Sequence, residues 1–202
     1  MSQHTALDGL FARTDQGDSR EKRPSVEGLI RRNRDISHSF KPMLTLKEMG
    51  ELPLEKRIPM PKIFLVACDD PRIKPHEFLG LQQWGVEEVV VALGVAGRIK
   101  HQFENMVFLD HFLQFEDIMI IHHTDCSAGI FPGEDIQAGL RSRVSDYDEK
   151  KIELPTYTDL NQSVRDDLAF VKSSPLVRPE LANRTRGFVF DIKTGKLREV
   201  LA

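Results

Sequence analysis

The sequence contains little cysteine: Cys68 and Cys126 are the only two among 202 residues. Two cysteines exclude the disulfide framework that stabilises small secreted proteins, and a single disulfide would be unusual in a reducing cytosol. Both residues are therefore expected to be free thiols or metal ligands.

Long apolar runs and a strong charge of either sign are also absent. No stretch approaches the ~20 residues that a membrane-spanning helix requires, and the N-terminal residues lack the apolar core of a secretory signal. We therefore expect a cytoplasmic protein that has no membrane partner. The formal net charge is −3 and no block of positive charge stands out, which argues against nucleic acid as a partner.

Length and composition indicate one soluble domain. The chain is 40% hydrophobic and 29% charged, as globular proteins are, and it is too short for two ordinary domains. Residues 1–25 are polar and without periodicity, which predicts a flexible N-terminal arm. Residues 26–202 are predicted to form the domain, beginning with a helix over residues 26–40, followed by a proline-broken connecting segment over residues 42–61.

Three short apolar runs predict the strands of a sheet. They cover residues 62–68, 86–93 and 117–123, and a segment with helical spacing of apolar residues lies between the second and the third. Buried strands separated by a helix are typical of a parallel sheet covered on both faces.

The last third of the chain predicts helices over residues 135–143 and 160–172, then a hairpin that turns at Lys193-Thr194-Gly195. The predicted fold class is therefore α/β: a single domain with a central, mostly parallel β-sheet flanked by helices, an N-terminal helical arm and a C-terminal hairpin.

A candidate metal site lies at the ends of two predicted strands. Cys68 ends the first strand, while His123 and Cys126 follow the third, and ligands of parallel sheets bind at the carboxyl ends of strands. Two thiols and an imidazole suit zinc, with a fourth position left for water or substrate. Each cysteine alone also fits a small buried hydrophobic residue. His122 is expected to point to the opposite face and to be structural.

The segment CDDPR adds a candidate carboxylate-guanidinium pair, Asp70 with Arg72. Such a pair would orient the carboxylate and lower its pKa, which keeps it a proton acceptor beside the metal. Asp69 is a rival carboxylate that spacing alone does not exclude, and ordinary surface charges at a turn are the simpler alternative. The glycine-containing segment ALGVAGR, residues 92–98, could bring backbone amides to the site, but a tight turn accounts for it.

At these motifs the sequence resembles the β-class carbonic anhydrases. That family carries C-x-D-x-R after one strand and H-x-x-C after another, and here the motifs read CDDPR and HTDC. The segment RIKPHEFLGL is similar to the family's R-I-D-P-x-x-x-L-G-L, and IHHTDC matches the form seen in one bacterial branch. SVRDDLAFVKSSPLV and RGFVFDIKTGKLREV resemble that branch's closing helix and hairpin, so the likeness runs from about Leu29 to Val200.

The resemblance implies zinc on Cys68, His123 and Cys126, with Asp70 and Arg72 as the catalytic dyad that orients and deprotonates metal-bound water. In some members the aspartate instead occupies the fourth zinc position at rest. The implied activity is that of a carbonate dehydratase, a zinc lyase that hydrates carbon dioxide reversibly to bicarbonate by a zinc-bound hydroxide. The implied assembly is a homodimer or homotetramer.

Three departures from the family pattern bear on the substrate. The usual serine of the first motif is Pro71, the glycine after the last cysteine is Ser127, and the loop R-N-A-G-G-R reads LGVAGR with Leu93 and Gly94. The more apolar loop leaves open a related zinc hydrolase or lyase acting on carbonyl sulfide, carbon disulfide or a larger metabolite. A non-catalytic zinc-binding homologue is the third alternative.

Overall fold

The structure is a computed structural model that describes residues 25–57, 59–81, 89–144, 146–148 and 152–201. The described residues fall into two compact units divided after Glu55. Residues 1–24 of the predicted arm lie outside the described residues, so the domain boundary after residue 25 stays a prediction.

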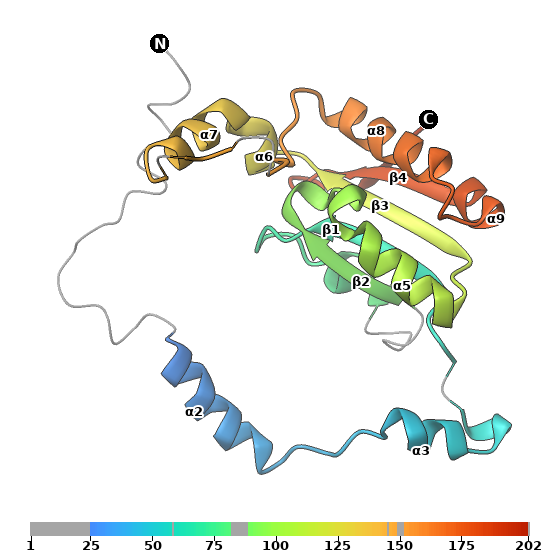
Figure 1. Cartoon of the computed structure of the whole chain (residues 1–202). Helices are drawn as coiled ribbons and strands as arrows, with labels where there is room; N and C mark the ends of the chain where they lie inside the picture. The colour runs from blue at the N-terminus through green and yellow to red at the C-terminus, as the bar shows by residue number, and fades with distance from the viewer. Residues whose placement is uncertain (1–24, 58, 82–88, 145, 149–151, 202) are drawn as a thin grey trace. The chain divides into compact units, whose positions relative to one another are not determined.

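Elements are labelled as in Figure 1. The first unit contains α2 (Val26–Ser37) and α3 (Leu46–Glu51), and the 3₁₀ turn η2 (Leu54–Lys56) spans the division. The strands of the second unit are β1 (Ile63–Cys68), β2 (Val89–Gly94), β3 (Asp117–His123), β4 (Thr185–Phe190) and β5 (Leu197–Val200). Its helices are α4 (Pro75–Phe78), η5 (Val95–Gly97), η6 (Ile99–Gln102), α5 (Phe103–Leu113), α6 (Ser127–Ile130), α7 (Gly133–Arg141), α8 (Leu160–Ser173) and α9 (Pro179–Asn183).

The second unit is built on one five-stranded sheet with the order β2-β1-β3-β4-β5. The first four strands run parallel and β5 is antiparallel to β4. This arrangement confirms the predicted α/β class and the C-terminal hairpin. The register sets Cys68 beside Gly94 of β2, and Ala67 beside Ile121 of β3. The carboxyl ends of the three strands therefore lie at one edge of the sheet.

Helices α5, α8 and α9 cover one face of the sheet (Figure 1), where their apolar side chains form a common core with Phe64, Ile118 and Ile120. Gly187 of β4 lets α8 approach closely, because a Cβ at this position would collide with Val164. The apolar residues of the other face include the two cysteines and are joined by those of α4 and neighbouring loops.

The first unit contains a helix that the apolar pattern did not predict. In α3, Thr45 and Glu48 form a capping box in which each side chain binds the other residue's backbone N–H, and this satisfies amides at the start of the short helix. The predicted helix over residues 26–40 is observed as α2, which begins after the cap Ser25 and ends at Ser37.

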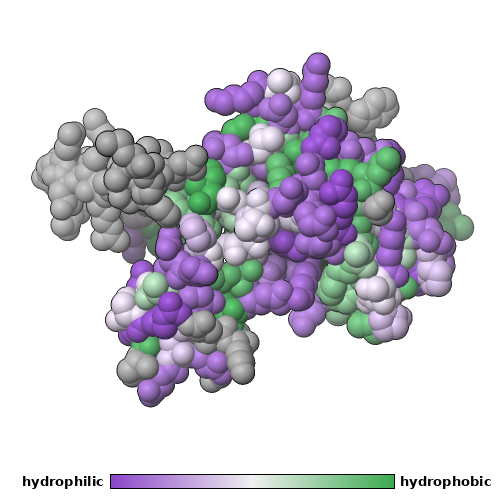
Figure 2. Space-filling model, turned by 90° about the horizontal axis from the view of Figure 1, so that it is seen from above, coloured by the Kyte–Doolittle hydropathy of each residue, from purple (hydrophilic) through white to green (hydrophobic). Residues whose placement is uncertain are grey.

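Hydrophilic side chains predominate on the face of the molecule shown in Figure 2, with hydrophobic residues between them. Within the part of the chain that the structure describes, no helix has the length and apolar character needed to cross a membrane.

Candidate metal centre

Two neighbouring parallel strands bring the three predicted metal ligands together. Cys68 is the last residue of β1 and His123 the last of β3, while Cys126 immediately precedes α6. The two sulfur atoms are 4.0 Å apart, and the ligand atoms of all three residues lie within 4.8 Å of one another. Each residue is at most 3% exposed. The structure therefore contains a buried cluster of two thiols and one imidazole.

The orientation of His123 fits a metal ligand. Its Nδ1 lies 2.9 Å from the carbonyl oxygen of Thr124, and because a carbonyl only accepts, Nδ1 carries the proton. The lone pair is then on Nε2, which is buried and has no hydrogen-bond partner among the described residues. A buried polar atom without a partner costs about 1–3 kcal/mol. A cation between Nε2 and the two sulfurs would remove this cost, and the donor set is one that zinc prefers.

The pKa values of the two thiols are shifted in opposite directions. The hydrogen bond from Cys68 lowers the pKa of Cys126, and His123 acts in the same direction. The same hydrogen bond, followed by burial, raises the pKa of Cys68, while the backbone amides of Asp70 and Ala96 lower it. One sulfur is thus ready to bind as thiolate, and a metal ion that binds both would release the proton of the other.

Arg72 holds the carboxylate of Asp70 beside this cluster. The Arg72 Nε donates to both Asp70 oxygens at 3.0 and 3.2 Å, and its Nη2 donates to Oδ2 at 2.7 Å. The backbone N–H of Arg72 also donates to Oδ1. The Arg72 side chain is the largest cause that lowers the pKa of Asp70 to about 2. Arg72 pairs with Asp70, whereas Oδ1 of Asp69 accepts a weak hydrogen bond from the Cys68 sulfur at 3.9 Å.

Asp125, which the sequence reasoning did not select, is a second partner of Arg72. Its Oδ2 accepts from Arg72 Nη1 at 2.7 Å and its carbonyl oxygen accepts from Nη2 at 2.9 Å. These bonds tie the loop after β1 to the loop after β3. The left-handed backbone of Asp125, with φ of 58°, is unusual outside glycine, but no local sequence pattern predicts it.

His122 points away from the cluster, as its alternation with His123 predicts. It is fully buried, with Nδ1 2.8 Å from Ser163 Oγ and Nε2 3.1 Å from Asp167 Oδ2. Asp167 also binds Arg98, at the end of the ALGVAGR segment. Sequence reasoning missed this network. The available signal was two polar residues four apart on the apolar side of α8, where they share one helix face.

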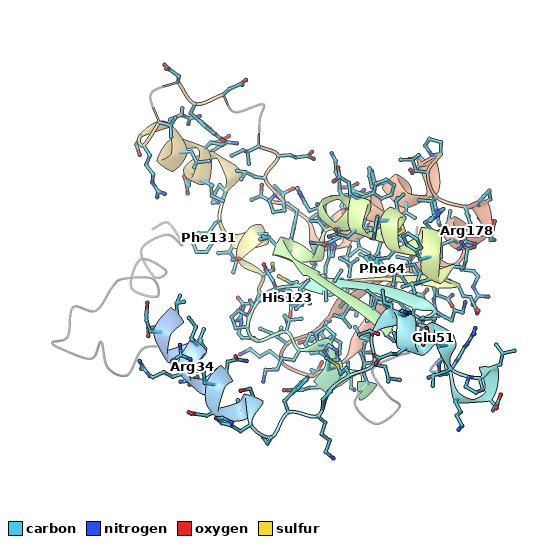
Figure 3. All side chains as sticks on the ribbon, turned by 60° about the horizontal axis from the view of Figure 1, so that its bottom comes forward. Arg34, Glu51, Phe64, His123, Phe131 and Arg178 are labelled. Carbon is cyan, nitrogen blue, oxygen red and sulfur yellow. The ribbon has the colours of Figure 1, made fainter. Side chains whose placement is uncertain are left out.

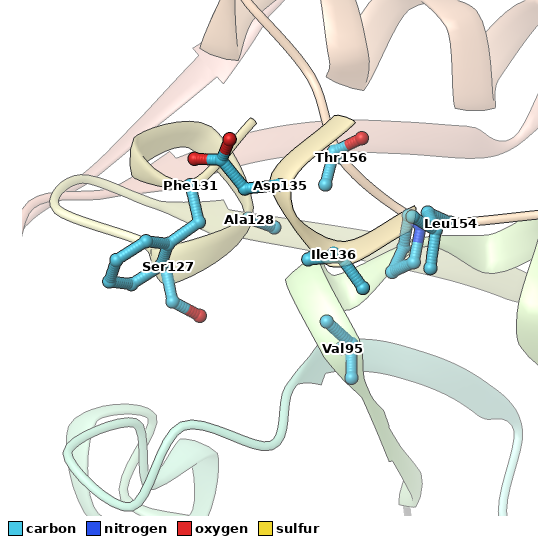
Figure 4. A pocket seen from close by; sticks show the side chains of 9 residues that line it. Val95, Ser127, Ala128, Phe131, Asp135, Ile136, Leu154 and Thr156 are labelled. Atoms are coloured by element: carbon cyan, nitrogen blue, oxygen red, sulfur yellow. The ribbon is translucent and has the colours of Figure 1, made fainter. Parts of the chain in front are cut away.

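An apolar pocket of about 450 Å³ (Figure 4) is lined in part by the residues that directly follow Cys126 in the chain. Ser127 and Ala128, which directly follow Cys126, form part of its wall, and Val95 of η5 forms another part. The remaining lining residues are Phe131, Asp135, Ile136, Leu154, Pro155 and Thr156. Val95 of the LGVAGR loop and Ser127 thus meet at one cavity.

The fold and the cluster together define an α/β protein with a buried candidate metal site of two cysteines and a histidine. No protein-family model matches the chain. Beta-carbonic anhydrase 1 of Mycobacterium tuberculosis is 29% identical over 180 residues, which cover 87% of this chain and 97% of that protein. The chain is therefore similar to β-carbonic anhydrases over most of its length.

Solved structures show the same similarity of fold. The carbonic anhydrase of Streptococcus mutans is 25% identical with a TM-score of 0.67, over 87% of this chain and 96% of that one. A carbon disulfide hydrolase in its apo form (14% identity, TM-score 0.57, 87% and 89% coverage) shares the fold. One of two tetrameric β-carbonic anhydrases from Sordaria macrospora also shares the fold. It is 16% identical with a TM-score of 0.52, over 86% of this chain and 91% of that one. A tetramer therefore occurs among the solved structures that share the fold.

Proposed function

We propose that the protein is a zinc-dependent carbonate dehydratase that hydrates carbon dioxide reversibly to bicarbonate. The observation that carries this proposal is the convergence of Cys68, His123 and Cys126 on one buried point, where His123 Nε2 has no hydrogen-bond partner among the residues that the structure describes. The similarity to β-carbonic anhydrases supports carbon dioxide as the substrate.

Cys68, His123 and Cys126 would hold the metal as three protein ligands, so that one tetrahedral position stays open. Bound zinc would supply the Lewis acidity that activates water near neutral pH. The buried surroundings of these ligands limit access of bulk water and favour a small apolar electrophile over a polar one.

Asp70 and Arg72 would act as the catalytic dyad. A carboxylate with a pKa of about 2 stays ionised throughout the neutral range, so Asp70 accepts a hydrogen bond and does not donate one. Arg72 restricts its orientation through both carboxylate oxygens. Asp70 would therefore orient the attacking water and receive its proton, while Arg72 keeps the carboxylate in place.

The apolar pocket favours a second candidate function. A cavity of about 450 Å³ is far larger than carbon dioxide needs, and its apolar lining would suit a sulfur-containing or larger electrophile. Hydrolysis of carbonyl sulfide or carbon disulfide with the same residues is therefore the alternative. Fast release of sulfide together with slow hydration of carbon dioxide would favour it.

We also propose that the chain works as a homodimer or homotetramer in the cytoplasm, with a small molecule as its substrate. The oligomeric relatives support the assembly, and the cysteine usage supports the compartment. Sedimentation of the purified protein at several concentrations tests the assembly, and a monomer at all of them would contradict it.

The first experiment is stopped-flow hydration of carbon dioxide by zinc-loaded protein across pH, with Cys126→Ser as the blank. A zinc-dependent rate that rises with pH supports the proposal. A protein that binds zinc but hydrates carbon dioxide no faster than the blank at any pH would contradict it.

The dyad is tested by Asp70→Asn against a matched control, Asp69→Asn. The two variants remove one negative charge each from adjacent positions, but Asp70 carries the ion pair with Arg72. We expect Asp70→Asn to retain zinc and to lose most turnover, by about 10²–10⁴-fold as for a proton-transfer group, while Asp69→Asn keeps its rate. Equal rates in the two variants would remove the role of Asp70.

A further inference from the structure

Asp167 is a buried carboxylate behind the metal centre, on helix α8, with 1% of its surface exposed. Its Oδ1 accepts a hydrogen bond from Arg98 Nε at 2.9 Å. Its Oδ2 accepts from the backbone N–H of Ile99 at 3.1 Å and lies 3.1 Å from His122 Nε2. Arg98, Ile99 and His122, which come from two different segments, therefore surround this one carboxylate in the core. Both of its oxygens have hydrogen-bond partners.

The first of these segments is the end of β3. His122 directly precedes the candidate ligand His123, and its ring is held at both nitrogens by α8: Nε2 by Asp167 and Nδ1 by Ser163 Oγ at 2.8 Å. Because successive residues of a strand point to opposite faces, a fixed ring at His122 restricts the rotation of the strand at His123. Asp167 thus acts on the histidine ligand from the far side of the sheet.

The second segment is the η5 turn, which packs against the ends of β1 and β3. A Cβ on Gly97 would lie 3.1 Å from the backbone nitrogen of Cys68 and 2.5 Å from the carbonyl oxygen of Ile121, so the turn touches both ligand-bearing strands. The amide of Ala96 also acts on the Cys68 sulfur. Arg98 and Ile99, the two residues after this turn, are the ones that bind Asp167.

The η5 turn is strained and needs to be held. Ala96 has φ of 62° and Gly97 has φ of 70°, and a left-handed conformation at a residue with a side chain persists only where the surroundings impose it. The two hydrogen bonds from Arg98 and Ile99 to Asp167 fasten the end of the turn to α8. Their loss would let the turn relax away from Cys68.

We propose that Asp167 is a positioning residue of the metal centre, which sets the Cys68 sulfur and His123 Nε2 at the spacing that zinc requires. It acts through the η5 turn on one side and through His122 on the other, and it touches neither ligand itself. The inference rests on the proposed function in that it takes zinc as the bound ion. Groups of this kind, which orient metal ligands without binding the metal, typically contribute 10–100-fold to metal affinity.

The chain offers a matched control in Asp110. This carboxylate on α5 is also largely buried and also binds one arginine and one backbone amide: Arg178 through Nη2 at 2.9 Å and Nε at 3.0 Å, and the Phe115 N–H at 2.9 Å. It lies at the other end of the sheet, however, because its partner Phe115 precedes the first residue of β3 whereas His123 is the last residue of that strand. Its partner Arg178 is likewise labelled apart from His123 in Figure 3. Replacing either aspartate by asparagine removes the same kind of buried ion pair.

The experiment compares Asp167→Asn with Asp110→Asn in the full chain. Zinc affinity is measured by competition with a chromogenic chelator, and the geometry of the site by the absorption of the cobalt(II)-loaded protein, whose thiolate charge-transfer bands report on sulfur ligation. We expect Asp167→Asn to bind zinc about 10–100-fold more weakly and to show altered cobalt bands. We expect Asp110→Asn to keep the wild-type affinity and spectrum although both variants lose stability.

Unchanged zinc affinity and cobalt bands in Asp167→Asn, or equal losses in both variants, would overturn the inference. If Asp167→Asn does not fold, Ser163→Ala replaces it. This variant removes the Oγ that holds His122 Nδ1 and, with it, the bond that this Oγ donates to the Leu160 carbonyl within α8. Weaker zinc binding supports the inference and wild-type binding overturns it. Carbon dioxide turnover plays no part in these measurements, so a wild-type protein that binds zinc but lacks hydration activity defeats the proposed function alone.

Discussion

Gly97 offers the sharpest test of how the metal centre is built. Its φ of +70° is costly for any residue with a side chain, and a Cβ there would lie 2.5 Å from the Ile121 carbonyl oxygen and 3.1 Å from the Cys68 nitrogen. Both obstructing atoms belong to the backbone, so no side chain can rotate out of the way. Gly97→Ala therefore has to displace either the η5 turn or the strands that carry the candidate ligands.

The magnitude follows from two contributions. The left-handed conformation costs an alanine about 1–2 kcal/mol, and overpacking against fixed atoms adds about 1–3 kcal/mol, which together give about 2–5 kcal/mol. Gly195→Ala is the matched control: Gly195 has φ of +67°, but apart from its chain neighbours no atom of the described residues lies within 4 Å of its Cβ position. This variant carries the conformational cost alone, about 1–2 kcal/mol.

The assay is urea unfolding of wild type, Gly97→Ala and Gly195→Ala, in the presence of chelator and again with zinc. We expect Gly97→Ala to lose about 1–3 kcal/mol more than Gly195→Ala and to gain less stability from zinc than the control does. Equal losses in the two variants, with equal stabilisation by zinc, would refute the reasoning that the turn packs against the ligand-bearing strands.

Three further predictions concern other parts of the second unit. Removing zinc with a chelator lowers the free energy of unfolding by about 4 kcal/mol if the free metal stood at about 1,000 times its Kd, and a calorimetric scan without a shift in melting temperature would contradict this. Leu168→Ala, in the core between α8 and the sheet, costs about 2–5 kcal/mol in urea unfolding, whereas a loss below 1 kcal/mol would mean that α8 packs loosely there. The amide of Lys193 lowers the pKa of Asp191; because the folded pKa lies below the unfolded one, this stabilisation is complete above about pH 4 and is lost as pH falls further. Asp191→Asn should therefore reduce the loss of stability between pH 5 and pH 3, and an unchanged acid profile would exclude this contribution.

The bounds of the strands were easier to predict than those of the short helices. The run at residues 117–123 was predicted at its observed bounds, Asp117–His123, since a strand buried on both faces is apolar throughout. The second run is observed over Val89–Gly94, and residues 86–88 lie outside the described part. Helix α7 begins at Gly133, two residues before its predicted start, because apolar spacing does not define where a short helix begins.

Residue spacing alone could not predict whether Asp69 or Asp70 pairs with Arg72. Both carboxylates follow Cys68, and spacing alone favours neither of them. The turn at residues 71 and 72 settles the pairing geometry, because it brings the backbone N–H and the guanidinium of Arg72 onto Asp70. The second carboxylate on Arg72 comes from Asp125, 53 residues further along the chain, and no sequence interval predicts such a contact.

The sequence by itself determined the α/β class, the parallel strands and the three residues that meet in the candidate metal centre, because strand periodicity and the rule that ligands bind at strand ends are local or nearly local properties. The tertiary structure alone decided that Asp167 reaches behind that centre and that the η5 turn packs against both ligand-bearing strands. It also decided that His123 Nε2 has no hydrogen-bond partner in the described part of the chain. These features depend on the packing of α8 and of the loops around the sheet, where residues far apart in the chain are brought within hydrogen-bond distance.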